Sequence, residues 1–267
     1  MKKTSLLLMV ILVIILSVML SVTTSHGVRK KRPPHHEYGN VVINNFSEKN
    51  KIAPVVFNHW LHRSQYTCRL CHADLKFALK INGSGITETA NKKGLYCGAC
   101  HNGKEAFGLV EKVRSGKKSS KNCDRCHSYG KKVAFKNKFY PFTKELPRAR
   151  FGNGVNWIKA EKEGQLKLKD MIKGYSTDKI RKDGPSDSII KPDVTEMPRI
   201  IFSHDNHAVW NGCSLCHPGL FKEEKGVPKI TMEGIIDGKF CGTCHGKVAF
   251  PVLDCQRCHT KPAILRR

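Results

Sequence analysis

Acidic residues are scarce in this sequence of 267 residues, which has 22 Asp and Glu against 47 Lys and Arg. The formal net charge of +25 is typical of nucleic-acid-binding proteins. The N-terminus argues against that partner, because it has the features of an export signal and an exported chain does not normally meet nucleic acid. The charge instead suits acidic protein partners, anionic lipid head groups or simply a solvated basic surface.

Long apolar runs are also lacking, apart from one that extends from about Leu6 to Val22. Two lysines precede this run and small residues follow it, which is typical of an export signal cleaved after Gly27. An uncleaved membrane anchor is the alternative, because the run is just long enough to span a bilayer. We therefore expect residues 1–27 to direct export, with the periplasm as destination and a membrane anchor or the outer surface as alternatives.

No cysteine stands outside a C-x-x-C pair, and no pair lacks a histidine directly after it. The six C-x-x-C-H segments pair twelve cysteines with six histidines: Cys68, Cys71 and His72; Cys97, Cys100 and His101; Cys123, Cys126 and His127; Cys213, Cys216 and His217; Cys241, Cys244 and His245; Cys255, Cys258 and His259.

Four kinds of site are possible for such a motif. Zinc binding by paired C-x-x-C motifs does not require a histidine after every pair. A thioredoxin-like site needs one C-x-x-C on a strand-to-helix turn, and structural disulfides need no fixed spacing. Covalent c-type haem explains every element, because two thiols add to the haem vinyl groups and the following histidine lies beneath the iron. We predict six covalent haems with these six histidines as proximal ligands.

The chain contains an internal repeat. The segment VVFNHWLHRSQYTCRLCH (55–72) aligns without a gap with IIFSHDNHAVWNGCSLCH (200–217), and a second and third C-x-x-C-H follow in both halves. We therefore divide the chain into a signal (1–27), an N-terminal extension (28–51), a first module (52–130), a connector (131–196) and a second module (197–263). Each module has a first, second and third haem site in chain order.

The F-x-H-x-x-H segment followed by three C-x-x-C-H sites resembles the c(7)-type triheme cytochrome domain of the multihaem class III cytochromes. The resemblance implies electron transfer and a fold of short helices and irregular chain around haems, with little β-structure. A short two-stranded hairpin near the start of each module fits this fold. Six phenylalanines are expected to pack on the haems: Phe57, Phe77, Phe107, Phe202, Phe221 and Phe250. In the connector we expect a short helix over Asn156–Glu163, which Trp157 and Ile158 pack on one module, and a loop over 176–193.

The distal ligands follow from the same resemblance. In the family, the two histidines of F-x-H-x-x-H ligate the first and second haems of the module. Carried over, His59 and His62 serve the first module, and His204 and His207 serve the second. A methionine at the place of Met232 can ligate the third haem, here the one at Cys255/Cys258.

The third site of the first module, Cys123/Cys126, has no such ligand, because Glu88 aligns with Met232. His35 or His36 of the N-terminal extension is the favoured substitute. Met171, a ligand from a second chain and an open iron are the alternatives.

The expected function is electron transfer with unnamed redox protein partners. By analogy with the family, the setting is anaerobic respiration, with metal-reducing respiration as one form of it. A multihaem reductase acting at an open Cys123/Cys126 haem is one alternative. All six motifs end in histidine, and no catalytic acid–base constellation surrounds them, so an enzyme is disfavoured. Self-association into a haem-lined filament is a second alternative, and membrane association is a further expectation.

Overall fold

The computed structural model describes residues 32–111, 120–131, 135–176, 185–192, 194, 196–224, 226 and 228–262. The predicted signal, including His26, lies outside these residues. Pro34–Arg267 forms one compact unit. Among the described helices, none has the length and apolar character needed to cross a membrane.

Short helices dominate the described chain. They are α2 (His59–Arg63), α3 (Glu88–Lys92), α4 (Cys123–Cys126), α5 (Phe135–Thr143), α6 (Trp157–Lys162), α7 (His204–Asn211), α8 (Met232–Ile236) and α9 (Cys255–Cys258), with a π-helix η1 (Leu70–Asp74) and 3₁₀ helices η2 (Tyr96–Ala99) and η3 (Phe240–Thr243). The longest of these has nine residues. The predicted fold class, short helices with little β-structure, is confirmed.

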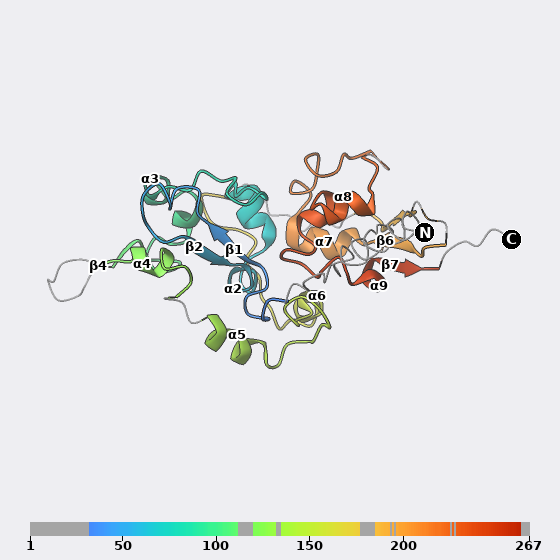
Figure 1. The fold of residues 1–267 in the computed structure, drawn as a ribbon, viewed down its shortest axis with the longest axis horizontal. Coiled ribbons are helices and arrows are strands. Elements are labelled where there is room, and N and C mark those ends of the chain that lie inside the picture. Colours follow the sequence, from blue (N-terminus) through green and yellow to red (C-terminus); the bar gives the residue numbers. More distant parts are fainter. Residues whose placement is uncertain are drawn as a thin grey trace, which may run out of the picture. The chain divides into compact units, whose positions relative to one another are not determined.

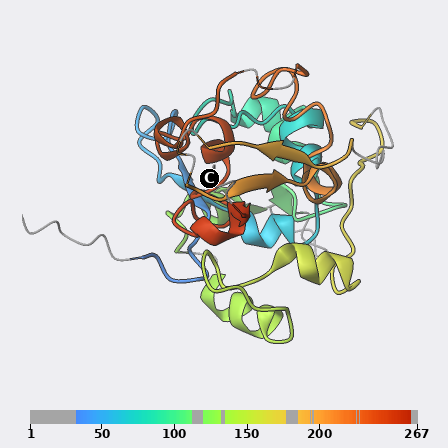
Figure 2. The same cartoon turned by 90° about the vertical axis from the view of Figure 1, so that its right-hand side faces the viewer.

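The strands form small antiparallel sheets. β1 (Asn40–Ile43) pairs with β2 (Val55–Asn58), and β3 (Val110–Glu111) pairs with β4 (Ser120–Lys121). In the second half, β6 (Arg199–Phe202) lies between β5 (Ser188–Ile190) and β7 (His259–Lys261) (Figure 2). The expected hairpin near the start of each module is therefore present, with a third strand added in the second module.

The connector differs from the sequence-based expectation at one segment. The loop predicted over 176–193 was wrong at Ser188–Ile190, which is strand β5. Ile189 and Ile190 pair with residues of β6, and β-branched side chains favour that extended, half-buried setting. The turn-forming residues on both sides of this short strand led to the prediction of a loop.

Each F-x-H-x-x-H segment changes from strand to helix at its first histidine. β2 leads directly into α2, and β6 leads through one residue into α7 (Figure 1). The side chain of Asn58 caps α2 by accepting a hydrogen bond from the Leu61 amide, and Ser203 caps α7 through the Asn206 amide. The caps fix the start of each helical turn, so both histidines of the segment project from the same short helix.

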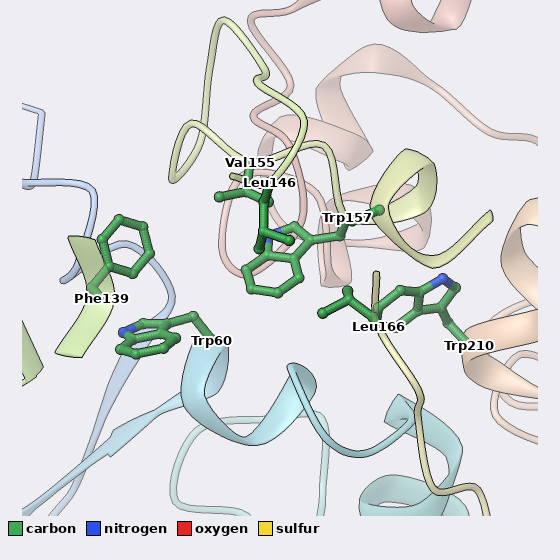
Figure 3. Close-up of a cluster of buried hydrophobic side chains, with 8 residues drawn as sticks. Trp60, Phe139, Leu146, Val155, Trp157, Leu166 and Trp210 are labelled. Atoms are coloured by element: carbon green, nitrogen blue, oxygen red, sulfur yellow. The ribbon is translucent and has the colours of Figure 1, made fainter. Parts of the chain in front are cut away.

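The buried apolar core lies in and around the connector. It comprises Trp60, Phe139, Leu146, Val155, Trp157, Ala160, Leu166 and Trp210 (Figure 3). The expected connector helix is confirmed as α6, capped by Asn156 at its start and Glu163 at its end. The expectation that Trp157 packs on one module was wrong, because its cluster includes Trp60 of the first module and Trp210 of the second.

Candidate haem-binding sites

Three histidine pairs face each other at a common distance. The ring centroids are 6.5 Å apart for His59 and His72, 6.4 Å for His62 and His101, and 6.2 Å for His207 and His245. A metal–nitrogen bond of about 2 Å on each side, plus about 1 Å from each nitrogen to its ring centre, places two axial imidazoles about 6 Å apart. The gap between these rings therefore fits one iron atom.

These pairs join the residues that the family resemblance assigns to the same haem. His59 meets the proximal histidine of the first site, and His62 meets that of the second site in the same module. In the second module, His207 meets the proximal histidine of the second site. His204 and His217, both described, do not form a comparable ring pair.

All ten histidines expected at the irons share one hydrogen bond. In each, Nδ1 lies 2.6–3.2 Å from a backbone carbonyl oxygen. A carbonyl oxygen only accepts, so Nδ1 carries the proton and Nε2 keeps its lone pair. Metal-ligating histidines almost always have such a partner, which fixes the ring orientation and the tautomer. The ten rings are therefore held ready to bind a metal through Nε2.

At the first and second sites, the carbonyl partner of the proximal histidine comes from the chain just after the C-x-x-C-H motif. At the first and second sites, the chain after the motif turns back so that a phenylalanine carbonyl accepts from the proximal histidine. The four acceptors are Phe77, Phe107, Phe221 and Phe250. We expected these residues to pack on the haems with their rings. The role of their backbone oxygens was not predicted, although the repeated Ala-Phe after the second site was its signal.

The third site of each module is bonded to the start of that module. His127 Nδ1 donates to Ala53 O at 2.9 Å, and His259 Nδ1 donates to Pro198 O at 2.6 Å. The acceptors precede these histidines by 74 and 61 residues. The last histidine of each module is thus hydrogen-bonded to the segment that leads into β2 or β6, and the bond joins the end of the module to its start.

Phe57 and Phe202 occupy equivalent places between the two distal histidines. The Phe57 ring centroid is 4.8 Å from that of His59 and 4.4 Å from that of His62. Phe202 lies 4.9 Å from His204 and 4.3 Å from His207. The phenylalanine of F-x-H-x-x-H therefore supports both imidazoles of its own segment, a contact that the spacing of the motif did not reveal.

A glycine is sterically required within the second site of each module. A Cβ atom at Gly98 would lie 1.9 Å from Asn91 O, and one at Gly242 would lie 1.8 Å from Ile235 O. No side chain fits at these distances. The two glycines let the haem-binding 3₁₀ turn contact the backbone of the preceding helix.

Burial sets the charge state of the thiols and imidazoles. It raises the pKa of Cys71, Cys97 and Cys244 to about 12 and that of Cys241 to about 11. It lowers the pKa of His59 and His245 to about 4. These surroundings disfavour a thiolate or an imidazolium and suit groups without charge. A thioether and a neutral imidazole are such groups.

The twelve cysteines, all of them described, form no disulfide. Eleven of them line one continuous cavity of about 2480 Å³, which both modules and the connector enclose. A usual ligand pocket has about 300–1,000 Å³. The cavity therefore has room for several large ligands rather than one.

Met232 and Glu88 occupy equivalent places in the two modules. Each is the first residue of a five-residue helix, α8 or α3, capped by a threonine hydroxyl, and each lines the cavity. Glu88 lies 2.6 Å from Lys92 through Oε1 and Nζ. The alignment that set Glu88 opposite Met232 thus holds in three dimensions.

The remaining ligand candidates for the Cys123/Cys126 haem are held differently from the ten histidines that have an Nδ1–carbonyl bond. The His35 ring lies beside Gly154, and the His36 ring packs against Tyr140 with centroids 6.0 Å apart. His36 Nδ1 is buried and has no hydrogen-bond partner among the described residues. Among the described residues, neither histidine has a carbonyl partner of the kind that orients the ten rings, and no contact joins Met171 to this site.

Covalent haem held by C-x-x-C-H and by imidazoles of this orientation is the chemistry of multihaem cytochromes c, which transfer electrons. The chain belongs to the family described as cytochrome c7 and related cytochrome c, whose model matches residues 55–128 and 200–260, half of the chain. The two matched ranges each contain one copy of the repeat.

Solved structures of multihaem cytochromes are similar in sequence. The C-terminal hexaheme fragment of GSU1996 is 28% identical, with 86% of this chain and 99% of that fragment covered and a TM-score of 0.26. The dodecaheme cytochrome c GSU1996 is 27% identical, with 89% and 52% covered and a TM-score of 0.26, so this chain spans about half of its length. A comparison with curated proteins found no match.

Proposed function

We propose that this chain binds six c-type haems and transfers electrons along them, within one module and from one module to the other. The ten oriented imidazoles carry this proposal. The six proximal histidines and the four distal ones all have the Nδ1–carbonyl bond, and three proximal–distal pairs have the ring spacing that one iron requires. We assign His59, His62, His204 and His207 as distal ligands on this basis.

The protein supplies attachment, ligation and a fixed environment. When bound, haem iron gains and loses single electrons. The twelve cysteines would hold the haems as thioethers, and the backbone carbonyls would keep each Nε2 directed at its iron. Burial keeps the imidazoles neutral, as ligation requires.

The continuous cavity supports electron transfer between the modules. It reaches the cysteines of all three sites in the first module and of all three in the second, although Cys213 itself is outside it. Haems that share one cavity lie closer together than haems in separate pockets. We propose that they form one chain of redox centres.

Mass spectrometry and a redox titration of the purified holoprotein test this proposal together. The expected mass is that of the processed chain plus six haems, and the titration should require six electrons per chain. A smaller number of haems, or haems that do not change oxidation state, would overturn it.

We also propose that the chain is exported and acts in the periplasm, attached to a membrane or at the outer surface as the alternatives. The apolar run from about Leu6 to Val22, with two lysines before it, supports export. The net charge of +25 favours acidic redox partners or an anionic lipid surface. Anaerobic respiration is the setting that the family suggests. Cell fractionation tests the location, and haem found in the cytoplasmic fraction would contradict it.

A reductase acting at the Cys123/Cys126 haem is the second candidate. The observation that favours it is Glu88 at the position of Met232, which removes the sulfur ligand from the first module. Electron paramagnetic resonance of the ferric protein should then show one high-spin haem in six. Turnover of nitrite or hydroxylamine would support the reductase, whereas wholly low-spin spectra would exclude an open iron.

A further inference from the structure

An arginine of each third haem motif stacks on the phenylalanine that follows the second motif. Each third motif reads C-x-R-C-H, with Arg125 in the first module and Arg257 in the second. The guanidinium carbon of Arg125 lies 3.6 Å from the ring centroid of Phe107. That of Arg257 lies 4.2 Å from the ring centroid of Phe250. Both distances are well within the roughly 6 Å of a cation–π contact.

The same two phenylalanines hold the proximal histidine of the second haem. The Phe107 carbonyl accepts from His101 Nδ1 at 3.1 Å, and the two ring centroids are 4.4 Å apart. The Phe250 carbonyl accepts from His245 Nδ1 at 3.2 Å, and these ring centroids are 4.2 Å apart. The guanidinium carbon is therefore at most 8.0 Å from the imidazole centroid in the first module and at most 8.4 Å in the second.

The stack is not a consequence of short chain connectivity. Arg125 comes 18 residues after Phe107, whereas Arg257 comes 7 residues after Phe250. Two connections of different length thus lead to the same contact. The first and second sites have other residues directly before the second cysteine: Leu70, Ala99, Leu215 and Thr243. The arginine is therefore specific to the third motif of each module.

We propose that Arg125 and Arg257 raise the reduction potential of the second haem of their own module. The inference rests on the proposed function, because it requires haems at Cys97/Cys100 and Cys241/Cys244. A haem iron lies about 3 Å beyond the centre of the imidazole that ligates it, so the charge is within about 11 Å of that iron. A positive charge at this distance stabilises the ferrous haem, which has one more electron than the ferric haem.

A redox titration of each haem, followed through its methyl resonances in nuclear magnetic resonance, tests the inference. Both arginines are exposed, so solvent screens part of their charge. Arg125→Met should lower the ratio of reduced to oxidised haem at Cys97/Cys100 by about threefold at a fixed potential. Arg257→Met should do the same at Cys241/Cys244. In each variant the second haem of the other module is the internal control and should keep the ratio of the parent. Arg125→Lys, which retains the charge, should stay closer to the parent.

The direction of the shift separates the charge from a purely structural role. If the arginine only held the phenylalanine in place, its loss would weaken the Nδ1–carbonyl bond. That bond raises the basicity of the ligating imidazole. A less basic imidazole favours the ferrous haem, so the ratio of reduced to oxidised haem would rise rather than fall.

Asp254 allows the charge to be changed in the opposite sense. Its Oδ2 lies 3.8 Å from Arg257 Nε, and its side chain is 14% exposed. The carboxylate therefore offsets part of the guanidinium charge. Asp254→Asn should raise the ratio of reduced to oxidised haem at Cys241/Cys244.

Arg150→Met is the matched control. Arg150 is also exposed and also lies over a phenylalanine ring, 5.1 Å from the centroid of Phe151, but it belongs to the connector. This variant should leave both second haems at the ratio of the parent. A parent protein with fewer than six haems would overturn the proposed function. With six haems bound, an unchanged or raised ratio at either second haem in its own arginine-to-methionine variant would overturn the present inference alone. If those variants fail to fold, an unchanged ratio in Asp254→Asn would overturn it.

Discussion

The imidazole rings of His59 and His72 lie parallel, with an interplanar angle of 7° and centroids 6.5 Å apart. Their Nδ1 atoms are hydrogen-bonded to different backbone oxygens, His59 to Gly39 O and His72 to Phe77 O. One ring belongs to the helix that follows β2 and the other to the C-x-x-C-H segment. Two separate local structures therefore hold the two rings at the spacing of a pair of axial imidazoles, each with its Nε2 free of the carbonyl bond.

Removal of one distal imidazole should change the spin state of one haem. His62→Ala takes away the ring opposite His101, so that iron loses its sixth ligand. The ferric protein should then show one high-spin haem more than the parent in electron paramagnetic resonance. His62→Met is the control, because a thioether restores six ligands and should keep the haem low-spin with a raised potential. An unchanged spectrum for His62→Ala would contradict the assignment.

Substitutions that exchange the residue types at Glu88 and Met232 should shift the reduction potentials of the two third haems in opposite directions. Glu88→Met supplies a thioether in the first module, and the potential of the Cys123/Cys126 haem should rise. Met232→Glu should lower the potential of the Cys255/Cys258 haem, by about 59 mV or more, equivalent to a tenfold change in the redox ratio. Redox titration resolved by haem checks both. Equal potentials in parent and variants would show that neither residue ligates iron.

Gly242→Ala should damage the second site of the second module. The new methyl group would meet Ile235 O, so the 3₁₀ turn must move away from α8. Overpacking of this kind costs about 1–3 kcal/mol, and the free energy of unfolding should fall accordingly. Denaturant unfolding of the holoprotein measures the change.

Gly219→Ala is the control for that change. Gly219 has an ordinary φ, and a Cβ atom there meets nothing within 4 Å. This variant should keep the stability of the parent. If both alanine variants were equally stable, the contact between the turn and α8 would not be tight.

Loss of the buried Arg69–Asp74 ion pair should lower the free energy of unfolding more than loss of an exposed ion pair. Asp74 accepts from Arg69 and from Ser176 Oγ at 2.7 Å, so it ties the first haem site to the connector. Asp74→Asn leaves the Arg69 charge buried without its partner, and the expected loss of stability is about 3–5 kcal/mol.

An exposed pair provides the comparison. Glu163→Gln breaks the contact between Lys159 and Glu163, whose side chains are 59% and 47% exposed. We expect a loss of about 0.5 kcal/mol or less. Similar losses for Glu163→Gln and Asp74→Asn would mean that the Arg69 guanidinium is hydrated in solution.

Much of this organisation could be predicted from residue spacing. The six C-x-x-C-H motifs, the two modules and the helix at Trp157 all depend on contacts close in sequence. Local rules such as capping by Asn156 suffice for that helix. The fold class was predicted from the family resemblance that the repeated F-x-H-x-x-H and C-x-x-C-H segments carry.

Features that depend on distant contacts were missed. Strand β5 forms because Ile189 and Ile190 find partners in β6, which local propensity does not reveal. The connector core draws Trp60 and Trp210 to Trp157 across the chain. The carbonyl partners of the histidines are backbone atoms, which any residue supplies, so residue identity could not indicate them.

The bonds from His127 to Ala53 and from His259 to Pro198 give each module a definite order of completion. The acceptor is made first and the donor last, so a module becomes a closed loop only when its final haem segment is in place. A chain ending after the second site would leave the entry to β2 or β6 unpaired. In the second module the same segment, β7, also adds the third strand to the sheet, whereas His127 of the first module forms only an isolated bridge with Val55.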